Sequence, residues 1–144
     1  MDSAGGSTVY VSARTDYAVR AMLSLAVDDP GLVKAATLAA SQDIPLSFLH
    51  GILLDLRRAG LLRSHRGVDG GYRLARPSTE ITVGDVVRAV GGALTTVRGL
   101  PTGAASYHGA AVGLGTVWAE VEVAITHVID RKTLAELSVS SVKN

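Results

Sequence analysis

The sequence contains no cysteine among its 144 residues. Disulfide bonds, thiolate nucleophiles and every cysteine-ligated metal or iron–sulfur site are therefore excluded. Aromatic residues are also scarce, at 4% of the chain, whereas hydrophobic residues reach 47%. A core built mainly from Ala, Leu and Val favours an ordered fold that is mostly helical or mixed.

The chain also has no large excess of charge of either sign, since its formal net charge is only +1. Net charge therefore does not indicate a binding partner. No apolar run reaches the roughly 18 residues that a membrane span needs. The polar start, MDSAGGS, does not resemble a signal peptide. We therefore expect a cytoplasmic protein without a membrane partner, in which residues 1–8 form a flexible tail.

Apolar residues recur at helical spacing in the first part of the chain. Helices are predicted over Ser12–Val27, Ala35–Ser41 and Leu46–Ala59. Ser12 can cap the first helix, whereas Lys34 occupies the cap position of the second and is a poor cap. The segment Gln42-Asp43-Ile44-Pro45 is predicted to be a turn. The core face of the third helix is predicted to consist of Leu49, Ile52, Leu53 and Leu56.

The period then changes, and short strands are predicted over Leu61–Ser64 and Tyr72–Ala75. Between them, His65–Gly71 is too long for a two-residue turn and predicts a hairpin with a mobile tip. From Arg57 to Arg76 the chain carries six arginines and one aspartate, a local excess of five positive charges. Positive charge is thus concentrated on one surface of a nearly neutral chain.

Two helices joined by a tight turn and followed by a strand hairpin are typical of the winged helix-turn-helix. A basic hairpin alone is often only a solvated loop, but its position directly after the two helices is much more specific. The predicted fold is mainly α with a small β-hairpin wing. A phosphate backbone is the partner that such a basic patch attracts, and Arg66, at the glycine-flanked tip, suits an electronegative minor groove.

The remainder of the chain predicts a different part of the molecule. A helix over Thr82–Val90 is capped by Thr82 together with Asp85, and it completes a DNA-binding domain over residues 9–92. Residues 93–112 are rich in Gly and Ala and are predicted to be a long loop and a candidate sensor segment. Residues 113–144 are predicted to hold a dimerisation helix and a C-terminal tail.

The long helix predicted over Val112–Arg131 has a wide apolar face, which needs a cover at the end of a small domain. The face is formed by Leu114, Val117, Trp118, Val121, Ala124, Ile125, Val128 and Ile129. A short helical turn, Thr133–Leu137, follows. A twofold dimer would cover the apolar face and place two recognition helices about 34 Å apart, one turn of DNA.

The chain resembles the Rrf2 family of bacterial transcription regulators over nearly all residues after position 8. The resemblance is carried by "ARTDYAVRAMLSLA" (13–26), "LSFLHGILLDLRRAGLLRSHRGVDGGYRLARP" (46–77), "ITVGDVVRAVGG" (81–92) and the C-terminal "VW" and "TLAEL". The most specific part is "RSHRGVDGGYRLARP". The resemblance implies a homodimeric winged-helix regulator, here a repressor, that binds palindromic double-stranded DNA.

The resemblance also implies roles for individual residues. Ser47 and His50 would meet base edges, and Arg66 would enter the minor groove. Weaker candidates for phosphate contacts are Lys34, Arg57, Arg58 and Tyr72. Some family members have an acidic or amide residue where this chain has His50, so the operator sequence of better-known members cannot be transferred.

The predicted sensor segment departs most from the family, many of whose members carry an iron–sulfur cluster held by three cysteines there. This chain has none, and we expect no cofactor. Two alternatives remain. One is a metal sensor that uses His108, His127 and a carboxylate such as Glu120 or Glu122. The other is a regulator controlled by docking a metabolic enzyme, or by an unidentified small molecule or protein. An enzyme is not expected, because no nucleophile–base pair, acid dyad or phosphate-binding glycine loop is found.

Overall fold

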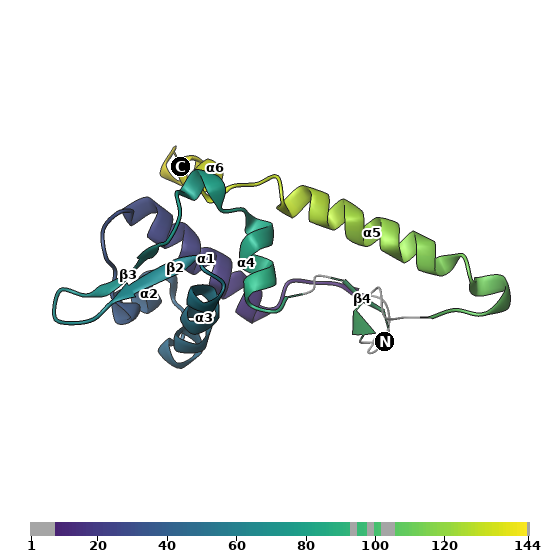
Figure 1. Ribbon diagram of the computed structural model, residues 1–144, viewed down its shortest axis with the longest axis horizontal. Coiled ribbons are helices and arrows are strands. Elements are labelled where there is room, and N and C mark those ends of the chain that lie inside the picture. The colour runs from purple at the N-terminus through teal and green to yellow at the C-terminus, as the bar shows by residue number, and fades with distance from the viewer. Residues whose placement is uncertain (1–7, 93–94, 98–99, 102–105, 144) are drawn as a thin grey trace.

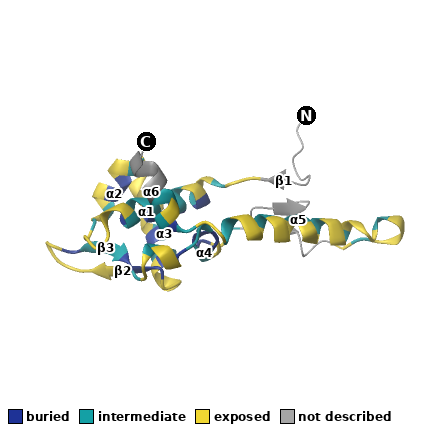
Figure 2. Ribbon diagram, turned by 90° about the horizontal axis from the view of Figure 1, so that it is seen from above, coloured by how far each residue is buried: buried dark blue, intermediate teal, exposed yellow. Residues whose placement is uncertain are grey.

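The protein is described by a computed structural model that covers residues 8–92, 95–97, 100–101 and 106–143. A helical bundle carries a strand hairpin at one end, and the long helix α5 extends away from the opposite side of the bundle (Figure 1). The bundle contains the buried residues, whereas α5 is exposed along most of its length (Figure 2). The mainly helical fold with a two-stranded wing is therefore confirmed.

The first three helices follow the apolar periodicity of the sequence. They are α1 (Ala13–Asp28), α2 (Ala35–Gln42) and α3 (Leu46–Arg58). Ser12 caps α1 by accepting a hydrogen bond from the Thr15 amide, as predicted. Lys34 precedes α2 without a side-chain cap, and the turn between α2 and α3 contains Asp43 in the left-handed conformation with φ 55°.

The wing consists of β2 (Leu62–His65) and β3 (Gly71–Leu74), which pair antiparallel with Leu62 opposite Leu74. Each strand lies one residue away from its predicted position, and the tip therefore narrows to residues 66–70. Gly70 must be glycine, because a Cβ atom there would lie 2.1 Å from the His65 carbonyl oxygen. Gly60, predicted to end α3 in the left-handed conformation, has φ 80°.

Helix α4 (Val83–Ala89) begins with the capping box that the sequence predicts. The Thr82 hydroxyl accepts from the Asp85 amide and the Asp85 carboxylate accepts from the Thr82 amide, each at 3.0 Å. A short 3-10 helix, Ser78–Glu80, connects the wing to α4.

The core lies where α1, α3 and α4 meet the base of the wing. The four residues predicted for the core face of α3, namely Leu49, Ile52, Leu53 and Leu56, are all completely buried. Met22 and Leu25 of α1 and Val86 of α4 join them in one cluster. This core holds the exposed face of α3 and the wing in a fixed relation.

The N-terminal tail and the segment after α4 contain short strands that the sequence did not predict. β1 (Thr8–Val9) pairs antiparallel with β4 (Thr95–Val97), and β4 pairs with β5 (Leu100–Pro101). A 3-10 helix, Gly109–Ala111, precedes α5. The loop expected over 93–112 is therefore partly regular, because backbone pairing across the chain does not depend on the local pattern of side chains. Residues 1–7 of the predicted tail lie outside the described residues.

The C-terminal helices also differ from the prediction. α5 spans Leu114–Ile129, and α6 (Leu134–Lys143) is a full helix where only a short turn and a tail were expected. Leu134 is completely buried, and its amide donates to the Ile81 carbonyl at 2.9 Å. The chain therefore returns to the bundle after α5, since α6 packs against α1.

One stretch, Gly109–Ile129, is long and apolar enough to cross a membrane by length and composition alone. No uninterrupted apolar run in the chain reaches about 18 residues, as expected, but this stretch meets the criterion because its mean hydropathy is high. The stretch contains Glu120 and Glu122 near its middle, and carboxylates at the centre of a bilayer are costly. A helix whose apolar face is covered by a second protein chain meets the same criterion.

Candidate nucleic-acid interface

The first turn of α3 presents the two residues predicted to read bases. Ser47 and His50 are both exposed, on the side of the helix away from the buried leucines. The helix-turn-helix packing places this surface outward, because α2 and α1 cover the opposite side. The N-terminal part of α3 is therefore free to enter a groove.

Arginines at the end of α3 lie next to the wing. Arg57 and Arg58 are exposed in the last turn of the helix. Arg57 Nη1 donates to the Ser64 hydroxyl of β2 at 3.3 Å. Arg58 lies further round the helix. Arg57 thus brings positive charge from α3 to the edge of the wing, and Arg58 leaves a second exposed positive charge at the end of α3, both suited to phosphate contacts.

Two further candidates, Lys34 and Tyr72, have internal contacts that shape the wing. Lys34 Nζ donates to the carbonyl oxygens of Gly67 and Gly70 at 3.4 and 3.3 Å. Tyr72 pairs with Val33 through two backbone hydrogen bonds of 2.8 and 3.0 Å, and its side chain is half-buried. These contacts join the wing and its tip, where Arg66 is exposed, to the residues just before α2.

The wing carries a pair of like charges that the sequence analysis did not single out. Arg63 and Arg73 are directly opposite each other in the β2–β3 register. Like charges in that relation destabilise a hairpin unless an anion neutralises them. The Nε of Arg73 is buried and has no hydrogen-bond partner within the described part of the chain. Register, which sequence alone does not supply, brings the two arginines together.

Helix α1 borders the exposed surface of α3 with residues that were also missed. The Arg14 guanidinium forms an ion pair with the Asp55 carboxylate of α3. Phe48 is 57% exposed in the first turn of α3, and its ring lies 6.3 Å from the Tyr17 ring. The sequence did contain a signal for Phe48. Its apolar side chain lies outside the stripe of residues that forms the core face of α3, which predicts an exposed aromatic ring.

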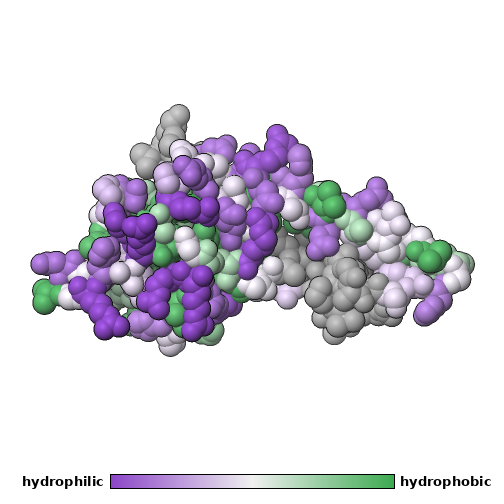
Figure 3. Space-filling view, viewed as in Figure 1, coloured by the Kyte–Doolittle hydropathy of each residue, from purple (hydrophilic) through white to green (hydrophobic). Residues whose placement is uncertain are grey.

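Hydrophilic and hydrophobic side chains are distributed unevenly over the surface of the molecule. Hydrophilic side chains crowd the winged end, whereas pale and hydrophobic side chains are more frequent along the α5 arm (Figure 3). The exposed apolar residues of α5 include Leu114, Val117, Val123 and Val128. The two ends of the molecule therefore offer different chemistry, ionic at the wing and apolar along α5.

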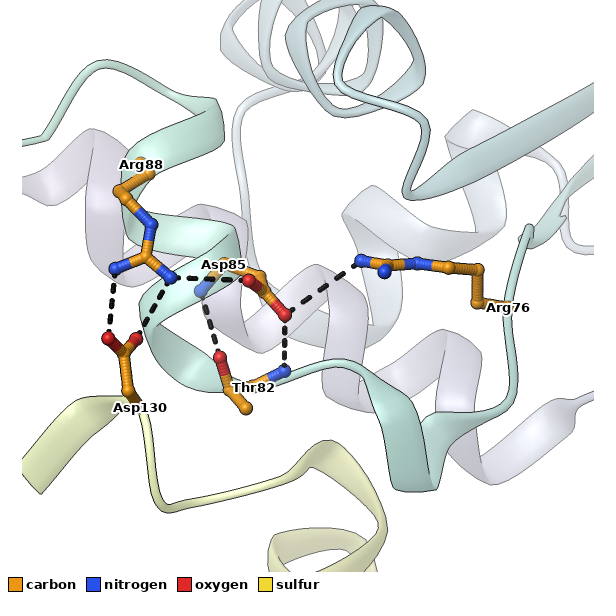
Figure 4. Close-up of polar contacts among 5 residues, drawn as sticks. All are labelled: Arg76, Thr82, Asp85, Arg88 and Asp130. Carbon is orange, nitrogen blue, oxygen red and sulfur yellow. Dashed lines mark hydrogen bonds and ion pairs between the residues drawn. The ribbon is translucent and has the colours of Figure 1, made fainter.

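A cluster of four charged side chains connects the end of α5 to the base of the wing (Figure 4). Arg88 of α4 contacts the Asp130 carboxylate at 2.9 Å and the Asp85 carboxylate at 3.2 Å. Arg76, which follows β3, lies 3.8 Å from the other oxygen of Asp85. Burial alone would raise the pKa of Asp85, but hydrogen bonds from Thr82 and Arg88 and the charge of Arg76 hold that pKa below its ordinary value.

The Asp85→Ala substitution is expected to lower the free energy of unfolding by about 1–2 kcal/mol at pH 7, through loss of the capping box and its ion pairs. A depressed carboxyl pKa stabilises the fold above the unfolded pKa of 3.8 and ceases to do so as pH falls through the folded value. The difference between the two proteins should therefore shrink below about pH 4. Urea titrations of both proteins at a series of pH values measure this difference in the free energy of unfolding.

Asp16→Ala is the matched control for that titration, since within the described part of the chain the Asp16 carboxylate forms only an exposed i,i+4 pair with Arg20, at 3.0 Å. Such pairs contribute about 0.3–0.5 kcal/mol. If both variants lost the same free energy of unfolding, the charged cluster would contribute no more to stability than an exposed ion pair.

A helix-turn-helix with an exposed second helix, followed by a basic two-stranded wing, defines a winged helix-turn-helix DNA-binding protein. The chain belongs to the Rrf2 family, because that family's model, described as "Iron-dependent Transcriptional regulator", matches residues 11–140. The relatives in this family are described as transcription regulators.

Individual relatives agree with this assignment. The HTH-type transcriptional regulator Rv1287 of Mycobacterium tuberculosis is 45% identical over 129 residues, which cover 89% of this chain and 80% of that protein. IscR of Cereibacter sphaeroides is 38% identical over 102 residues, covering 69% and 64% of the two chains.

Solved structures agree as well. IscR of T. potens superposes with a TM-score of 0.75 at 32% identity and covers 92% of this chain and 88% of its own. CymR, the global cysteine regulator of B. subtilis, superposes with a TM-score of 0.76 at 25% identity, covering 92% of this chain and 98% of its own.

The iron in the family's description does not fit the residues of this chain. Iron–sulfur clusters are held by thiolates, at most partly replaced by imidazole, and this sequence has no cysteine. Among the described residues, no three His, Asp or Glu side chains lie close enough together to hold a metal ion. His127, one of the alternative ligands, is instead in contact with Arg131 at 3.0 Å.

Proposed function

We propose that the protein is a homodimeric repressor that binds a palindromic operator in the cytoplasm and carries no iron–sulfur cluster. The observation that carries the proposal is the common surface formed by the exposed turn of α3, the arginines at its end and the wing. Ser47 and His50 are assigned to base edges in the major groove, and Arg66 to the minor groove.

Phosphate contacts are assigned to the cationic rim around that surface. Arg57 and Arg58 take this role at the end of α3, and Arg63 with Arg73 adds to it on the wing, where a phosphate would relieve their mutual repulsion. Lys34 and Tyr72 are assigned mainly to stabilising the wing through their internal contacts. A contact with a DNA phosphate is their second assigned role.

The dimer is proposed to form through α5. Its apolar stripe is uncovered in the single chain, with Val117 and Val128 at 46% and 58% exposed. A second copy would bury the stripe, and a twofold relation would direct the two copies of α3 toward successive major grooves. The signal that controls binding is proposed to enter at residues 93–112, whose described part joins the bundle to α5.

Selection of bound sequences from a random duplex library tests this function. Enrichment of an inverted repeat with half-site centres about one helical turn apart is expected. Enrichment of no sequence would contradict the proposal. Mapping the enriched sequence onto the genome then shows whether it overlaps promoters, as repression requires.

The Arg66→Ala substitution is expected to weaken binding to the selected duplex by about 1–3 kcal/mol without changing the circular dichroism spectrum. The reason is that Arg66 is exposed at the tip, beyond the contacts that hold the wing. Fluorescence anisotropy measures the effect. Unchanged affinity would remove Arg66 from the interface.

The purified protein is expected to be colourless and free of iron and acid-labile sulfide, even when oxygen is excluded, because the chain offers no thiolate ligand. An absorption spectrum and an iron assay on anaerobically purified protein measure this. Stoichiometric iron would instead favour the metal-sensor alternative through His108 and nearby carboxylates. Co-purification of an enzyme from native lysate would favour control by docking.

A further inference from the structure

Gly51 lies in the middle of the outward face of α3. It follows Ser47 by four residues and precedes Arg58 by seven, and these spacings keep all three residues on one face of the helix. The buried leucines occupy the opposite face. At this half-buried position α3 itself therefore contributes no side chain, and the Arg14 side chain of α1 lies nearest to it.

Nothing in the described part of the chain requires a glycine at this position. Gly51 is in regular helix, outside the set of residues with positive φ. A Cβ atom at Gly51 would meet only the Arg14 Nη1 atom, at an ordinary van der Waals distance of 3.8 Å. Gly70, by contrast, is forced by its own backbone. A glycine inside a helix is less stable than alanine, so the chain accepts a loss of stability here without an internal benefit.

We propose that Gly51 forms a notch that lets the backbone of α3 lie directly against the edge of a base pair in the major groove, an inference that rests on the proposed function of α3. The notch lies one helical turn after Ser47 and beside the Arg14 guanidinium, which forms an ion pair with Asp55. Gly51 thereby sets the depth at which the recognition helix sits.

The notch makes stability and binding respond in opposite directions. A methyl group at position 51 fits the free protein and favours the helix, so the unfolding midpoint should rise. The same methyl group occupies the space assigned to the base pair and holds the helix away from the groove. Direct base contacts then lengthen, whereas contacts to phosphates from the flexible arginines persist.

The test compares Gly51→Ala with Gly115→Ala, a matched control in α5. A Cβ atom at Gly115 would meet Tyr107 Cδ2 at 3.7 Å, which is again an ordinary contact. Both variants are titrated with urea, and both are measured by anisotropy against the duplex selected by the wild-type protein and against a scrambled duplex.

Gly51→Ala is expected to raise the urea midpoint and to bind the selected duplex about tenfold or more weakly, with unchanged binding to the scrambled duplex. Gly115→Ala should bind both duplexes as the wild-type protein does. Wild-type affinity of Gly51→Ala for the selected duplex, or a lowered urea midpoint, would overturn the inference. Failure of the wild-type protein to prefer any duplex would overturn the proposed function instead, and the inference with it.

Discussion

Val117→Glu and Val128→Glu are expected to convert the protein to a monomer and to weaken operator binding by about 10²- to 10⁴-fold. Both side chains are exposed in the single chain and lie on the apolar stripe of α5. Burying an unpaired carboxylate at an apolar interface costs several kcal/mol. Once the two copies separate, the half-sites no longer share one association step, and the avidity is lost. Sedimentation and anisotropy measure the two effects.

These positions separate dimerisation from folding. Val121 and Ile125 lie on the same stripe but are half-buried by the chain itself, so glutamate there would disturb the monomer as well. Ala119→Glu is the control, because Ala119 is exposed on the other side of α5. A Val117→Glu protein that still sediments as a dimer would show that another surface makes the contact.

Operator affinity is expected to fall steeply with salt. If each copy neutralises three or four phosphates, the slope of log affinity against log salt should be about −5 to −7. Between 50 and 200 mM salt the affinity would then fall by roughly 10³- to 10⁴-fold. The physical reason is release of condensed counterions by the arginines of α3 and the wing. Anisotropy titrations at a series of salt concentrations measure the slope.

A single substitution tests which arginines contribute to that slope. Arg58→Ala should make it less negative by about two, since the dimer loses one phosphate contact per copy. Arg131→Ala, just after the C-terminal end of α5 and outside α3 and the wing, should leave it unchanged. A flat salt dependence of the wild-type protein would count against DNA binding through this surface.

Much of the fold could be predicted because it depends on local chemistry. The Ser12 cap, the Thr82–Asp85 capping box and the left-handed Gly60 involve residues close in sequence. The core face of α3 followed from a helical repeat of leucines. For the same reason, the order of two helices and a basic hairpin predicted a wing, and with it a DNA-binding surface containing Arg66. The resemblance to the Rrf2 family added Ser47 to that surface.

The parts that were missed depend on pairing between distant residues. Strands β1 and β4 pair although most of the helices of the bundle lie between them in the sequence. Helix α6 is stabilised by burial of Leu134 against segments much earlier in the chain. Neither contact is marked by a pattern of neighbouring residues from which it could be predicted. The same holds for the cluster of Asp85, Arg88 and Asp130, in which the end of α5 meets α4.

The sequence by itself determined the class of protein and the absence of thiolate chemistry, since composition and local periodicity are properties of the chain alone. Only the tertiary structure decided which cations face each other and which faces stay open. Strand register sets Arg63 opposite Arg73, and packing of α1 beside α3 brings the Arg14 guanidinium next to Gly51. These relations exist only once the core has fixed the elements in space, because each depends on the distance between residues that are remote in sequence.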